Sequence, residues 1–153
     1  MTEAIEAMSN GSGDRDRRLT LSLLWSFVLF NYIYADFGTF ATILMKPELF
    51  ERFQSGQFGS VHFSQWFMLA AAVLMEIPIS MVILSWLLRR RSNRMANIVA
   101  GTIMTLVILF TLFGAGKVPP PNFYTLFQVI EIAATAAIAL YAWNWPRTDS
   151  TAA

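Results

Sequence analysis

The sequence lacks cysteine altogether, and it contains a single histidine, His62. Without cysteine the chain cannot form disulfides, thiolate metal sites, iron–sulfur clusters or thiol nucleophiles. One histidine cannot hold a haem between two imidazoles, and because His62 falls in a loop, it cannot serve a Ser-His-Asp triad inside a membrane. We therefore expect no catalytic residue, no metal site and no cofactor. A non-enzymatic function is favoured over an enzymatic one.

Charge is scarce as well. Only 14% of the 153 residues are charged, against about 25% in an ordinary soluble domain, while 56% are apolar and the mean hydropathy is +0.49. The 11 Lys and Arg residues nearly balance the 10 Asp and Glu residues, so the chain has no basic surface for nucleic acid. This composition predicts an integral membrane protein of one domain, with the lipid bilayer as its main surrounding.

Four apolar segments are each long enough to cross a bilayer. A helix needs about 20 mainly apolar residues to span a hydrocarbon core of about 30 Å. The expected spans are 19–45, 62–88, 95–113 and 122–145. They predict an all-α fold, a four-helix transmembrane bundle over residues 19–146.

Short polar segments flank and connect these spans. Residues 1–18 are rich in Gly, Ser and Asp and are expected to be a disordered tail, and residues 147–153 to be a second tail. The loop 46–61 contains Pro47 followed by alternating apolar and charged residues. This pattern is compatible with a short amphipathic helix at the membrane interface and equally with a plain loop.

The distribution of basic residues predicts the orientation. Basic residues near span ends favour the cytoplasmic side. One side carries eight arginines (Arg15, Arg17, Arg18, Arg89, Arg90, Arg91, Arg94 and Arg147), and the other carries Lys46, Arg52 and Lys117. We therefore expect both termini in the cytoplasm, in a multi-pass protein of the inner (plasma) membrane.

Three acidic residues, Asp36, Glu76 and Glu131, fall inside predicted spans, and no Lys, Arg or His lies at the same depth. An unpaired carboxylate in hydrocarbon is costly, so each must be protonated, hydrated in a cavity or neutralised by a bound cation. At about 1.5 Å per residue, Glu76 and Glu131 both lie about 18 Å above the inner boundary, and Asp36 about 25 Å. We expect Glu76 and Glu131 to share the bundle interior, with Asp36 near its mouth.

Neighbouring polar residues extend these positions into stripes. Tyr32 lies one turn before Asp36, and Gln128 lies one turn before Glu131. Facing stripes would form a polar pocket in the outer half of the bundle, open to the non-cytoplasmic side. The candidate ligand- or proton-binding residues are Glu76, Glu131, Asp36, Tyr32, Gln128, Asn31 and Tyr34. The structural alternative is that the glutamates are hydrogen-bonding staples between helices and that Asp36 faces the headgroups.

A small-residue stripe on the third span, Asn97, Gly101 and Thr105, is suited to close helix contact. Such faces can serve one bundle or two copies, and the sequence leaves a monomer and a homodimer both open.

Three segments carry a family resemblance: NYIYADFG, MEIPISMVILSWLL followed by RRRSNRMANIVAG, and FQVIEIAATAAIALYAWNWP. Over most of residues 19–147 the chain resembles an uncharacterised family of small prokaryotic four-helix membrane proteins, loosely similar to the DoxX-like group. The resemblance implies a fold and a topology. It implies no substrate and no catalytic motif.

Three functions are compatible with these residues. In the first, the acidic pocket binds a proton, a cation or a small ligand, in a small transporter or an accessory subunit. In the second, the chain is a structural or interaction subunit of a larger membrane complex. In the third, it is an enzyme that acts on a lipid or quinone, with two glutamates and a tyrosine as acid and base.

Overall fold

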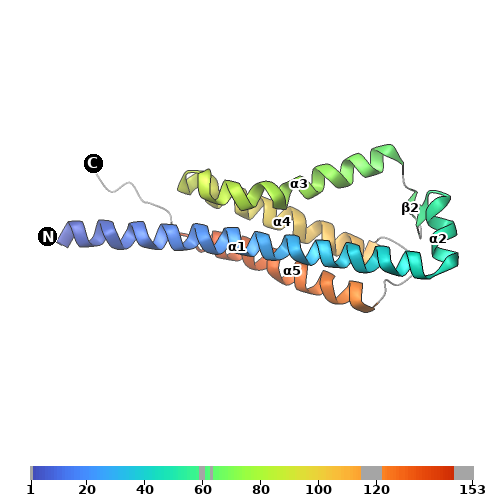
Figure 1. The fold of residues 1–153 in the computed structure, drawn as a ribbon. Coiled ribbons are helices and arrows are strands. Elements are labelled where there is room, and N and C mark those ends of the chain that lie inside the picture. The colour runs from blue at the N-terminus through green and yellow to red at the C-terminus, as the bar shows by residue number, and fades with distance from the viewer. Residues whose placement is uncertain (1, 59–60, 63, 115–121, 147–153) are drawn as a thin grey trace.

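The computed structural model describes residues 2–58, 61–62, 64–114 and 122–146. It is helical apart from one small hairpin, and its long helices are α1 (Thr2–Met45), α3 (Gln65–Leu87), α4 (Arg90–Gly114) and α5 (Asn122–Trp143) (Figure 1). Four segments are long and apolar enough to cross a membrane: Gly13–Met45, Gln65–Leu87, Arg90–Phe113 and Asn122–Trp143. The predicted all-α fold with four apolar spans is confirmed, and the first and third spans begin earlier than predicted.

The four long helices form an antiparallel bundle (Figure 1). α3 packs on α1 and α4, and α5 packs on α4 and α1, so that α3 and α5 occupy diagonal corners. The core between them is built by large side chains with almost no exposed surface, among them Leu21, Trp25, Met104 and Ile138. α3 runs along one side of the bundle and diverges from the other helices toward its N-terminal end (Figure 1).

The expected disordered tail at residues 1–18 is wrong for residues 2–18, because α1 already begins at Thr2. The segment Thr2–Met8 is rich in Ala and Glu, which favour helix. The Asp14 carboxylate also accepts a hydrogen bond from Trp145 Nε1 at 3.1 Å and pairs with Arg90 Nε at 3.4 Å, and both partners are distant in the sequence. The tail predicted at 147–153 lies outside the described residues.

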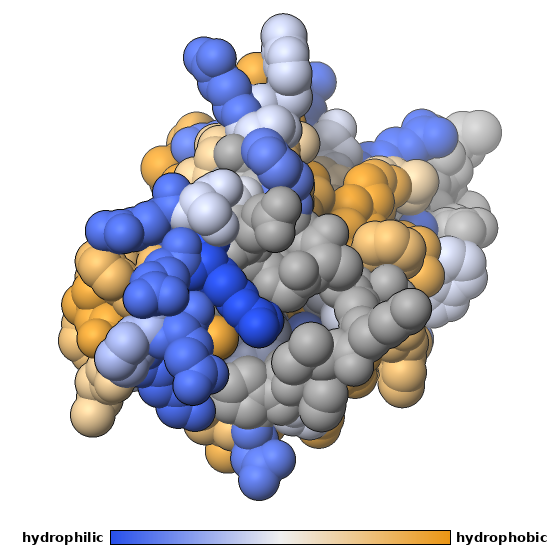
Figure 2. Space-filling model, turned by 90° about the vertical axis from the view of Figure 1, so that its right-hand side faces the viewer, coloured by the Kyte–Doolittle hydropathy of each residue, from blue (hydrophilic) through white to orange (hydrophobic). Residues whose placement is uncertain are grey.

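The loop 46–61 contains a helix, α2 (Pro47–Gln54), with Pro47 in its first turn. The segment is therefore a short helix and not a plain loop, and its place at the membrane interface stays a prediction. Gly56, with φ of 76°, turns the chain after α2 into a two-stranded antiparallel hairpin of β1 (Gln57–Phe58) and β2 (Val61–His62), which the sequence did not predict. Figure 2 views this end of the bundle, where hydrophilic side chains gather left of centre and hydrophobic side chains lie on both flanks.

At the opposite end, arginines hold the C-termini of the helices. Arg18 Nη1 donates to the carbonyl oxygens of Trp86 at 2.8 Å and Leu88 at 2.7 Å. Arg94 Nη2 donates to the Trp143 carbonyl at 3.0 Å. The last carbonyls of a helix have no partner in that helix, and the helix dipole favours a cation there. These arginines therefore have a structural role beside their expected role in topology.

We predict that Arg18→Ala lowers the free energy of unfolding by about 1–2 kcal/mol, because two carbonyls lose a charged donor. Thermal unfolding in detergent measures this, with Arg15→Ala as the control because Arg15 is exposed on the same helix. Equal melting temperatures for the two variants would show that the carbonyl contacts contribute nothing.

A buried polar network ties three helices together in the half of the bundle near these arginines. Asn93 Nδ2 donates to the Ser85 carbonyl at 2.6 Å, and Asn97 Nδ2 donates to Asn93 Oδ1 at 2.7 Å. Trp25 Nε1 donates to Asn97 Oδ1 at 2.7 Å. The network fixes α1 and α3 against α4.

The small-residue stripe on α4 packs closely on α5, as predicted. Gly101 is buried, and a Cβ added there would lie 2.8 Å from the Thr135 carbonyl oxygen. One turn further along, the hydroxyls of Thr105 and Thr135 share a hydrogen bond of 2.8 Å. α4 and α5 therefore approach at backbone distance.

Candidate functional site

The site begins with a polar face on α5. Gln128, Glu131 and Thr135 are spaced by three and four residues, which places them on one side of a helix. That side faces the interior, since their exposed fractions are 3%, 3% and 0%. Thr135 donates to the Glu131 carbonyl at 2.8 Å, and Gln128 Nε2 donates to Thr111 Oγ1 of α4 at 3.1 Å. The Glu131 side chain thus lies among polar groups inside the bundle.

Three oxygen atoms around this face are buried and have no hydrogen-bond partner within the described part of the chain: Glu131 Oε1, Gln128 Oε1 and the Tyr32 hydroxyl. A buried polar atom without a partner costs about 1–3 kcal/mol, and such atoms are few in native proteins. Three within one region of the bundle indicate a place where a proton, an ion, water or a polar ligand completes the hydrogen bonding.

Electrostatic interactions define which groups belong together. Tyr32 interacts with Glu131, Tyr124 and Asp36, and Asp36 also acts on Tyr124 and Glu131. No cation is among the groups that act on Glu131 in the described part of the chain. We call Tyr32, Asp36, Tyr124, Gln128 and Glu131 the Glu131 cluster. It joins α1 to α5, and its one exposed carboxylate is Asp36.

The structure brings together four of the seven predicted residues: Tyr32, Asp36, Gln128 and Glu131. It does not bring in Asn31 or Tyr34. Asn31 is buried, but its amide donates to the Phe27 carbonyl of its own helix at 2.8 Å. Tyr34 is 63% exposed, because it lies on the outer side of α1.

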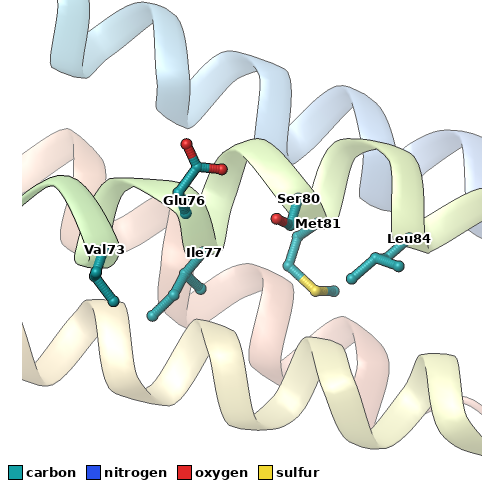
Figure 3. A pocket seen from close by; sticks show the side chains of 6 residues that line it. All are labelled: Val73, Glu76, Ile77, Ser80, Met81 and Leu84. Carbon is teal, nitrogen blue, oxygen red and sulfur yellow. The ribbon is translucent and has the colours of Figure 1, made fainter.

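The position of the Glu76 side chain differs most from the prediction. It was expected in the interior beside Glu131, but its side chain is exposed on α3. The buried residues of α3 are Pro78, Met81 and Ser85, about half a turn away from Glu76. In Figure 3 the Glu76 carboxyl turns to the other side of the helix from Ile77 and Met81, which point toward α4. Equal depth does not bring the two glutamates together, because α3 and α5 lie at diagonal corners.

Two members of the site, Tyr124 and Thr111, were not predicted from the sequence. Tyr124 lies two turns before Glu131, and the spacing Tyr124–Gln128–Glu131 of four and three residues would have placed it on the same face. Thr111 had no such signal, because its role depends on how α4 is rotated against α5.

A family model described as a family of unknown function, DUF6326, matches residues 9–152. The chain belongs to this family. The match covers α1 from residue 9 onward, the three other long helices and the whole Glu131 cluster, and it agrees with the resemblance to an uncharacterised family. It gives no support to a DoxX-like relationship. No curated protein and no solved structure matches the chain.

The residue set of this DUF6326 chain limits what the cluster can bind. Among the described residues, no three His, Cys, Asp or Glu side chains gather closely enough to hold a metal ion. Carboxyl, amide and phenol oxygens are hard ligands, which suit a proton or a small cation better than a soft transition metal.

Proposed function

We propose that this DUF6326 chain binds a proton or a small monovalent cation at Glu131, as a small transporter or an accessory subunit of one. The observation that supports the proposal is the buried Glu131 Oε1 without a hydrogen-bond partner, next to a phenol and an amide oxygen in the same state. A proton makes the carboxyl a donor, and a cation accepts oxygen lone pairs from all three groups. Either one satisfies buried atoms that the protein leaves unpaired.

The approach to the site follows from α1. Asp36 lies one turn beyond Tyr32 and is exposed, so its carboxylate attracts cations at the outer part of the bundle. From there a proton or cation reaches Glu131 past the phenols of Tyr32 and Tyr124. In this proposal the site opens on the side of the membrane that faces α2 and the hairpin.

We further propose that both termini are cytoplasmic, because Arg18 of α1 and the arginines at the start of α4, Arg90 and Arg94, lie at the same end of the bundle. Reporter fusions test this orientation. A cytoplasm-active reporter is expected to work after Ser92 and at the C-terminus, and a periplasm-active reporter after Ser55. The reverse pattern would contradict the orientation and place the Asp36 opening in the cytoplasm.

The binding proposal is tested by thermal unfolding in detergent at constant ionic strength. Na⁺ or K⁺ is exchanged for choline, and each series is run at acid and alkaline pH. A ligand that binds only the folded protein raises its melting temperature with concentration. We expect the wild-type melting temperature to depend on pH or on the small cation. Glu131→Gln is expected to abolish that dependence, because the Gln side chain keeps the shape of Glu but exchanges no proton and carries no charge.

Glu76→Gln is the matched control, because it makes the same change midway along another span, outside the Glu131 cluster. It is expected to retain the wild-type dependence. If Glu131→Gln responds to pH and to Na⁺ or K⁺ as the wild type does, the proposed site is wrong.

A further inference from the structure

The outer face of α3 has no role in the Glu131 cluster. Glu76 lies midway between Gln65 and Leu87, so in a membrane it sits at the centre of its span. Its side chain is exposed, and α3 contains no Lys, Arg or His to neutralise it. A carboxyl at this depth is costly in lipid, and such residues normally find a hydrogen-bonding partner. The question is what covers Glu76.

Glu76 belongs to a regular stripe. Along α3 a stripe of residues follows at alternating steps of four and three, which is the 3.5-residue period of a coiled-coil seam. We call this stripe the α3 seam, and its members are Leu69, Val73, Glu76, Ser80, Ile83 and Leu87. Its apolar members are 53%, 62%, 59% and 73% exposed, in chain order. The face of α3 that packs in the bundle is the opposite one, with Pro78, Met81 and Ser85.

A shallow hollow of about 310 Å³ runs beside the α3 seam, lined by Val73, Glu76, Ile77, Ser80, Met81 and Leu84 (Figure 3). All six residues come from α3, so the hollow has one wall. Small-molecule sites usually bury 70–90% of the ligand, which one helix face cannot do. A second helix suits this surface better, because its side chains fill the spaces between those of the seam.

We propose that a second copy of this chain covers the α3 seam, in a symmetric dimer with the two α3 helices packed in parallel. Copies with the same membrane orientation pair only in parallel, and a two-fold axis then places each residue opposite itself. The two Glu76 carboxyls meet at one depth, and a protonated carboxyl both donates and accepts a hydrogen bond. The hydroxyl of Ser80, one turn along the α3 seam, is a second hydrogen-bonding partner for the Glu76 carboxyls.

A second copy of the chain fits the α3 seam because the seam is self-complementary. A second α3 supplies a carboxyl opposite the carboxyl and apolar side chains opposite the apolar ones, with no cation required. A polar position in an otherwise apolar seam, here Glu76 with Ser80 one turn on, is also the device that fixes register in coiled coils. Figure 1 shows α3 along one edge of the bundle.

Disulfide crosslinking tests the contact directly. The chain has no native cysteine, so one substitution gives one unambiguous position. Val73→Cys and Ser80→Cys are expected to form dimers on mild oxidation in membranes, because a disulfide needs Cα atoms within about 7 Å. Val129→Cys is the matched control: Val129 is 53% exposed near the middle of α5 and faces away from α3. Dimers at Val129→Cys equal to those at the α3 seam would contradict the proposal.

The role of Glu76 is tested by energy transfer between labelled copies in liposomes as lipid is added. Glu76→Leu is expected to weaken the dimer about 3- to 30-fold, the range for an interhelical hydrogen bond in a membrane, whereas Glu76→Gln keeps a donor and an acceptor and stays near the wild type. Melting temperatures confirm that both variants fold. A wild type that stays monomeric, or a Glu76→Leu dimer as strong as the wild type, overturns the proposal and assigns the α3 seam to lipid or to another protein.

Discussion

Gly101→Val is expected to destabilise the protein by about 3 kcal/mol or more, the upper range for overpacking a close contact. A Cβ at this position would lie 2.8 Å from the Thr135 carbonyl oxygen and 3.2 Å from the Ala139 Cβ and backbone nitrogen. Two of these three atoms belong to the backbone of α5, so no side-chain rotation relieves the clash. α4 and α5 would have to separate, which also breaks the hydrogen bond between Thr105 and Thr135.

Three further glycine substitutions calibrate this effect by thermal unfolding in detergent. Gly101→Ala is expected to be clearly destabilising, though less than Gly101→Val. Gly38→Ala should cost less, because its Cβ meets at 2.8 Å the ring of Phe123, a side chain that can move. Gly13→Ala meets nothing within 4 Å and should be neutral or slightly stabilising. If Gly101→Ala melts together with Gly13→Ala, the backbone approach of α4 to α5 is wrong.

The fold was predictable because length and hydropathy alone identify four helical spans, and short connections make neighbours antiparallel. The order of the helices around the bundle was not. Glu76 and Glu131 lie near the middle of their helices, as their positions in the sequence indicate. The prediction that they share a pocket failed because residue counting gives depth along a helix, whereas the contact depends on which corner each helix occupies and how it is rotated.

The parts of the site that were predicted lie on single helix faces. The stripe of Gln128 and Glu131 is a local pattern, and so is the step from Tyr32 to Asp36. The prediction of a disordered tail in place of the first turns of α1 was wrong for a different reason. Gly and Ser lower local helix propensity, but Asp14 contacts Trp145 and Arg90, which are distant in the sequence, so no local pattern shows these contacts.

The buried network of Trp25, Asn93 and Asn97 is the clearest case of a long-range feature, since it joins residues of α1 and α4 that are 72 positions apart. It also bears on the site. Tyr32 lies two turns along α1 from Trp25, so the network sets the position of α1 against the bundle at the level below the Glu131 cluster. Loosening it should therefore move Tyr32 relative to Glu131 as well as lower stability.

We predict that Asn97→Leu lowers the free energy of unfolding by about 3 kcal/mol, because it leaves two buried groups without partners, Trp25 Nε1 and Asn93 Oδ1. A double-mutant cycle with Trp25→Phe isolates the pair. Once Trp25 has lost its N–H, Asn97→Leu no longer strands that donor, so the double variant should be more stable than the sum of the single effects predicts, by about 1–3 kcal/mol. Strictly additive losses in unfolding experiments would mean that the 2.7 Å contact between Trp25 and Asn97 does not stabilise the bundle.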